Sequence, residues 1–135
     1  MPGTVNQVAA GLKARLATIS GLRTYAYQPE QLNPPVAYPV LNGVTYHRAF
    51  AGGDVVMEWS IYVVVGRWTD SRAYDTLDGF LSYSGATSVR AAIEADPTLG
   101  GVCQTLIVAS SISILPQQQA DAEFLMIRVD VTVHA

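Results

Sequence analysis

The sequence predicts an α+β fold, in which an antiparallel-rich mixed sheet packs against helices on one face. Three observations predict it. Apolar residues recur at helical spacing near the amino terminus, two long segments alternate with a period of two, and the predicted helices and strands are grouped along the chain. With 135 residues and 50% hydrophobic content, the chain is long enough for one domain over residues 1–135 with a single core.

The first predicted element is an amphipathic helix that begins after Thr4 and ends before Gly21. Thr4 is a suitable N-cap, and Gly21 is suited to the residue that follows a helix. The apolar residues are three or four positions apart, so they share one face. This stripe consists of Val5, Val8, Leu12, Leu16 and Ile19.

Strand-like segments follow this helix. We expect short strands over 23–27, 36–41 and 44–50, with the proline-rich segment 28–35 as an extended connection. Gly52-Gly53-Asp54 then provides the residues of a hairpin turn. From Val55 to Val65 every odd position is apolar, which predicts a long strand with one face on the core.

Two further helices and two strands complete the chain. Thr69 can cap a helix that extends to Leu81 and buries its apolar stripe, and Thr87 or Ser88 can cap a short helix over Val89–Ala95. The apolar residues expected to be buried by the longer of these helices are Ala73, Leu77, Phe80 and Leu81. We expect strands over 105–115 and 122–133, separated by a loop over 116–121.

Composition excludes several classes of protein. Charged residues make up 14% of the chain, compared with about a quarter in an average domain. The formal net charge is −3 and the arginines are scattered, so no basic stripe for nucleic acid is present. The one cysteine excludes an internal disulfide. Without a long apolar stretch or a signal-like amino terminus, we expect a soluble protein made in the cytoplasm, with no membrane partner.

No set of residues predicts catalysis, a metal site or a cofactor. His47 and His134 have no neighbouring ligands at metal-binding spacing, and we interpret both as ordinary polar positions. Cys103 is interpreted as a small buried thiol, although a cysteine–histidine pair is conceivable. Asp75 and Asp78 share a helix face, where solvation and helix-terminal interactions explain them more simply than acid–base chemistry.

Apolar residues on faces that should be wet form the most informative anomaly. Val56, Tyr62 and Val64 lie opposite the core face of the long strand, and Phe124 and Met126 lie opposite that of the last strand. Two interpretations stay open. Either the chain's own loops cover this second face, or it packs against a neighbouring subunit.

The order of segments resembles the tail terminator (tail completion) proteins of long-tailed phages, particularly those of actinobacterial hosts. The resemblance rests on residues 12–39, on "VTYHRAF" (44–50), on residues 63–102 and on "AEFLMIRVDVTV" (122–133). Its most distinctive phrase is "SGATSVRAAIEADPTLGGV".

The resemblance implies a virion structural protein of α+β fold. Such subunits close into a ring, usually of six, at the head-proximal end of the tail tube, where the ring stops tube polymerisation and meets the head connector. The implied partners are other copies of the chain, the tail tube protein and the connector, and DNA passes through the lumen without sequence-specific binding. No cofactor or metal is implied.

Five residues are our candidates for the subunit interface. On the outward faces of the two long strands these are Glu58, Tyr62, Arg128 and Asp130, and at a strand-to-helix junction it is Trp68. Two alternatives to a terminator remain open at this point. One is a head–tail connector or neck protein, and the other is a small oligomeric ligand-binding domain.

Overall fold

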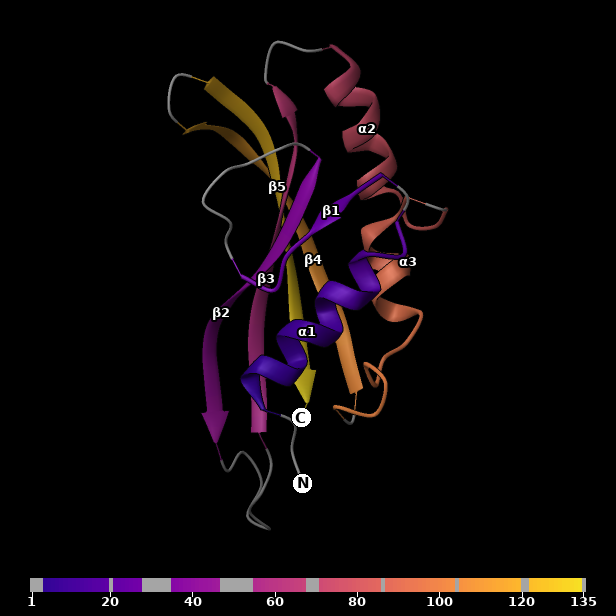
Figure 1. The fold of residues 1–135 in the computed structure, drawn as a ribbon, viewed down its shortest axis with the longest axis vertical. Helices are drawn as coiled ribbons and strands as arrows, with labels where there is room; N and C mark the ends of the chain where they lie inside the picture. The colour runs from indigo at the N-terminus through magenta and orange to yellow at the C-terminus, as the bar shows by residue number, and fades with distance from the viewer. Residues whose placement is uncertain are drawn as a thin grey trace.

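The structure is a computed structural model (Figure 1) that describes residues 4–19, 21–27, 35–46, 55–67, 71–85, 87–103, 105–119 and 122–134. Side chains are described in all of these except residues 67, 71–74, 109–119 and 122–124. The elements in chain order are α1 (Val5–Leu16), β1 (Arg23–Thr24), β2 (Val36–Tyr46), β3 (Val55–Arg67), α2 (Ser71–Leu81), α3 (Val89–Glu94), β4 (Thr105–Gln119) and β5 (Ala122–His134).

The strands form one five-stranded sheet in the order β1-β2-β3-β5-β4. Among the described strands, β1 and β2 pair in parallel and the other three pairs are antiparallel. Figure 1 shows the helices gathered along one side of the strongly twisted sheet. The predicted α+β class, with a mixed and mostly antiparallel sheet covered by helices on one face, is therefore confirmed.

The main core lies between the sheet and the helices. All three helices contribute to one apolar cluster with the inward residues of the long strands, which alternate along β3 and β5 as the period of two predicts. Its fully buried members include Leu12 of α1, Ile93 of α3, Ile61 of β3 and Ile127 of β5. Leu12 lies on the predicted helical stripe, Ile61 on the predicted alternation of the long strand, and Ile127 on the predicted core face of the last strand.

The helix α1 begins as predicted and ends earlier. The Thr4 Oγ1 accepts the Gln7 backbone N–H at 3.1 Å, and the Gln7 Oε1 accepts the Thr4 N–H at 2.9 Å, which is a complete capping box. The C-cap is Ala17 rather than a residue next to Gly21. The chain beyond Ala17 continues in tight turns that still bury Ile19, so the apolar spacing outlasts the helix.

Two predicted strands are one strand in the structure. The segments 36–41 and 44–50 were expected to be separate, whereas β2 extends from Val36 to Tyr46. A register shift between Leu41 and Gly43 leaves one extra residue in the strand, and such a bulge lets a strand continue through a Gly-containing interruption. Residues 47–54, which include the predicted hairpin turn, lie outside the described residues, as does most of the proline-rich segment 28–35.

The loop predicted over 116–121 is wrong for most of its length. β4 extends to Gln119, and Gln117 and Gln119 pair with residues of β5. The register shifts between Ile114 and Gln117, on either side of Pro116. A proline lacks the N–H that a regular ladder needs, and a bulge is where a strand tolerates it.

The third helix begins at one of its predicted caps. Ser88 caps α3, and its Oγ accepts the Ala91 N–H at 3.2 Å. In α2, Phe80 is buried, but Leu81, which was predicted to be buried, is exposed. Consecutive helical residues point about 100° apart, so Leu81 projects away from the core that buries Phe80. Trp68 and Thr69 lie outside the described residues.

Candidate functional site

The candidate site lies on the sheet face opposite the helices, which we call the second face. Register places its residues in rows across β2, β3 and β5, because paired residues of adjacent strands project to the same side. Its described side chains are those of Val36, Tyr38, Val40, Thr45, Val56, Glu58, Ser60, Tyr62, Val64, Met126, Arg128, Asp130, Thr132 and His134.

One end of the second face is an apolar cluster of its own. Val64 pairs with Val36 on one side and Met126 on the other, and the three side chains are buried. In the next row the rings of Tyr38 and Tyr62 stack, with centroids 5.8 Å apart and planes inclined by 26°. Burial, together with the neighbouring Tyr62 hydroxyl, raises the pKa of Tyr38 above its usual value.

The burial of apolar residues on the second face corrects one expectation. Val56, Val64 and Met126 were predicted on a wet face, and they do lie on the second face, but at most 5% of each is exposed. For Val64 and Met126 the physical reason is cross-strand packing, since apolar neighbours on adjacent strands cover one another without a helix. The side chain of Phe124 lies outside the described ones.

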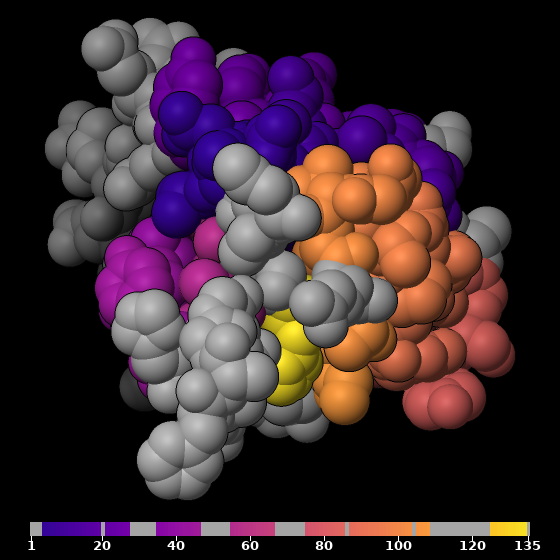
Figure 2. All heavy atoms as spheres, turned by 90° about the horizontal axis from the view of Figure 1, so that it is seen from below, coloured from indigo at the N-terminus to yellow at the C-terminus, as the bar shows by residue number. Residues whose placement is uncertain are grey.

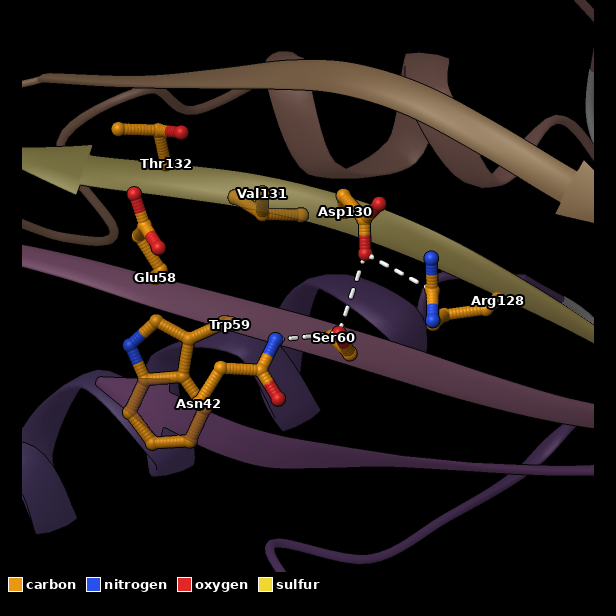
Figure 3. Close-up of a pocket in the computed structure, with 8 residues that line it drawn as sticks. All are labelled: Asn42, Glu58, Trp59, Ser60, Arg128, Asp130, Val131 and Thr132. Carbon is orange, nitrogen blue, oxygen red and sulfur yellow. Dashed lines mark hydrogen bonds and ion pairs between the residues drawn. The ribbon is translucent and has the colours of Figure 1, made fainter.

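The centre of the second face is a polar pocket of about 400 Å³, shown in Figure 3. Ser60, one of its lining residues, has a short side chain that leaves room between the strands' longer polar side chains. The lining residues are Asn42, Glu58, Trp59, Ser60, Arg128, Asp130, Val131 and Thr132.

A short chain of polar contacts crosses this pocket from β2 to β5. The Asn42 Nδ2 donates to the Ser60 Oγ at 2.5 Å, and the Ser60 hydroxyl donates to the Asp130 Oδ1 at 3.1 Å. The same Oδ1 lies 3.2 Å from the Arg128 Nε in an ion pair. Both charged side chains are about one-third exposed, so water screens the pair and its contribution to stability is at most about 1 kcal/mol.

The remaining charge in the pocket belongs to Glu58. This residue is exposed, and its carboxylate makes no hydrogen bond or ion pair with the described side chains. The pocket therefore holds two carboxylates and one guanidinium, a net charge of −1 with hydroxyl and amide oxygens beside them. Such a set favours a cationic group.

Four of the five predicted interface residues come together here. Glu58, Arg128 and Asp130 line the pocket, and Tyr62 lies opposite Arg128 in the ladder. The fifth, Trp68, is outside the described residues.

Asn42 and Ser60 line the pocket but were not among the predicted site residues. The available signals were the Asn-Gly pair inside a β-rich segment and a serine in the alternation of the long strand. Neither signal shows that the two side chains meet, since their contact depends on the register of β2 with β3.

Other candidate chemistry is limited in the described part of the chain. Cys103 is a buried free thiol, as predicted, and its Sγ lies 3.3 Å from the Pro97 carbonyl oxygen. Burial, with Asp96 nearby, raises the pKa of this thiol. Among the described residues no group of three His, Cys, Asp or Glu could hold a metal ion. Of the helices described, none has the length and apolar content that a membrane crossing needs.

No protein-family model matches the sequence, and no curated protein matches it either.

Proposed function

We propose that the protein is a structural subunit of a phage tail terminator ring. The observation that carries the proposal is the two-sided sheet, in which the described helices pack on one face while the second face presents a polar pocket with an unpaired carboxylate. A subunit with two unlike sides is suited to head-to-tail contacts, and these close into a ring when each contact adds the right rotation. The resemblance of the sequence supports the choice of a tail terminator.

In this proposal the ring caps the head-proximal end of the tail tube in the virion. It ends tube polymerisation and offers its other side to the head connector, and DNA passes through its lumen. A net charge of −3 per subunit suits a lumen that must release phosphates rather than bind them. Contacts that bury roughly 1,200–2,000 Å² each would make such a ring stable by itself.

The first test is the mass of the purified protein in solution, measured by light scattering over a concentration series, with negative-stain images of the same sample. The expected result is a closed ring of about six subunits with a central hole. A protein that stays monomeric or dimeric both alone and when mixed with tail tubes contradicts the proposal.

The second test is Arg128→Glu, which places a second carboxylate beside Asp130 on the second face. We expect the subunit to remain folded and ring formation to be lost, because the variant breaks the Arg128–Asp130 ion pair, and repulsion among three carboxylates in the pocket displaces the side chains that a neighbouring copy contacts. The matched control is Arg90→Glu, which also reverses a partly exposed arginine in an ion pair but lies on α3. Circular dichroism checks the fold and light scattering the mass; unchanged assembly of the Arg128→Glu variant removes Arg128 from the interface.

The pocket itself favours one second candidate, a small ligand-binding domain, because it is concave and several polar groups converge on it. A thermal-shift screen with small cationic metabolites and metal ions discriminates the two functions. A ligand selective for the folded state must raise its apparent stability.

A further inference from the structure

An unpaired positive charge lies on the helical side of the molecule, opposite the pocket. Lys13 is in the last turn of α1, is exposed, and makes no hydrogen bond or ion pair through its side chain with the described residues. It is also the one lysine in the sequence. The other basic residue in this last turn is Arg15, whose Nε donates to the Ala92 carbonyl oxygen at 3.0 Å. The first turn of α1 has no acidic residue.

The unpaired Glu58 and the unpaired Lys13 cannot meet within one subunit. The helix α1 packs onto the core face of the sheet through Val8, Leu12 and Leu16, whereas Glu58 projects from the second face. The sheet and its core separate the two charges. In two copies of the chain placed face to back, they can meet.

We propose that Lys13 of one copy binds in the Glu58–Asp130 pocket of the next copy. The inference rests on the proposed ring and names the contact that builds it. An ammonium group carries three donors, and the pocket offers the Glu58 carboxylate and the Thr132 hydroxyl as acceptors. The ammonium also cancels the net charge of −1 in the pocket.

The contact joins two different patches, which sets its symmetry. A twofold dimer brings the same patch of both copies together, whereas here each copy uses its helical side for one neighbour and its second face for the other. Repetition of such a contact gives a ring or an open filament. The Lys13–Glu58 contact therefore produces head-to-tail assembly, and the angle between successive copies determines whether the assembly closes into a ring.

A zero-length carbodiimide cross-link tests the contact, because Lys13 provides the only side-chain amine. A 1:1 mixture of ¹⁵N-labelled and unlabelled protein is treated with carbodiimide at high concentration, and linked peptides are identified by mass spectrometry. The expected product joins Lys13 to Glu58 or Asp130 in mixed-isotope pairs. Links from Lys13 only to Asp75 or Asp78 of α2, or no intermolecular link, overturn the inference.

Charge reversal is the second measurement. Lys13→Glu and Glu58→Lys alone each weaken association on the order of tenfold or more, and the double variant recovers it because the pair is again attractive. The control double variant, Lys13→Glu with Asp75→Lys, changes charge equally but does not recover. Failure of the Lys13→Glu, Glu58→Lys variant to recover overturns the inference.

These outcomes separate the contact from the proposed function. Rings that form without the Lys13–Glu58 link, and that both single variants leave intact, overturn the contact while the ring stands. Mixed-isotope links in a protein that builds open filaments instead of rings support the contact and overturn the terminator ring.

Discussion

The two faces of the sheet are made from the same strands but are stabilised differently. On the core face, apolar side chains run along the length of β3 and β5 and are covered by three helices. On the second face, the apolar cluster around Val64 gives way to a pocket with Asn42, Ser60 and Asp130 at its centre. Alternation alone does not distinguish a face that stabilises the fold from one that offers a binding surface. The two kinds of face are distinguished by the elements that pack on them.

This difference between the faces predicts that substitutions at neighbouring residues of β3, which point to opposite faces, lower the stability by very different amounts. It is the largest effect that we predict. Ile61→Ala removes a fully buried side chain and should lower the free energy of unfolding by about 2–5 kcal/mol. Ser60→Ala removes two hydrogen bonds beside an open pocket, where water can replace them, and should cost about 1 kcal/mol. Denaturant unfolding of both variants measures the contrast, and equal losses would show that the second face is as important for stability as the core.

A smaller effect is expected where two parts of the helical layer touch. Figure 2 shows α1 and the segment after α3 side by side, and a Cβ on Gly11 would lie 2.9 Å from the Leu99 Cβ. Leu99 is buried with a φ of 50°, so it has little freedom to move away. Gly11→Ala should therefore lower stability, because overpacking costs about 1–3 kcal/mol against the gain of about 1 kcal/mol from helix propensity.

The control for this variant is Ala14→Gly, on the exposed side of the same helix. It should also lower stability, by about 1 kcal/mol. Helix propensity by itself predicts opposite signs for the two changes. A stabilised Gly11→Ala variant would therefore show that α1 and Leu99 are not in tight contact.

Local signals in the sequence predicted the core face better than the second face. The caps at Thr4 and Ser88 and the alternation of β3 depend on neighbours within a few residues, and all three appear in the structure. The burial of Val64 depends on partners in β2 and β5, and the strand through Pro116 depends on β5. Those partners are distant in the sequence, so periodicity does not reveal them.

Some residues of the candidate site could be predicted from local sequence patterns, and others depend on strand pairing. Alternation was enough to place Glu58, Arg128 and Asp130 on one face of the sheet. It could not place Asn42, because the bulge in β2 sets the direction of its side chain. The pocket is thus a product of strand register, which a single sequence does not show.

The smallest predicted effect lies in the turn that joins the helical layer to β4. The Asp96 carboxylate accepts the Thr98 Oγ1 at 2.9 Å and the Thr98 N–H at 3.3 Å through one oxygen, and the Gly100 N–H at 2.9 Å through the other. These bonds, chiefly that from the Thr98 side chain, hold the pKa of Asp96 below its usual value of 3.8. Asp96→Asn replaces the oxygen facing Gly100 with a donor, and we expect a slightly lower melting temperature at pH 7.

The effect of Asp96→Asn on the melting temperature should depend on pH, and the lowered pKa of Asp96 sets the direction of that dependence. A carboxyl whose pKa is lower in the folded state stabilises the fold above its unfolded value, and this stabilisation is lost as the pH falls through the folded pKa. The difference in melting temperature between wild type and Asp96→Asn should therefore be constant from pH 7 to pH 5 and shrink below about pH 4. A difference that stays the same down to pH 2.5 would mean that the turn is held by backbone geometry rather than by the charge of Asp96.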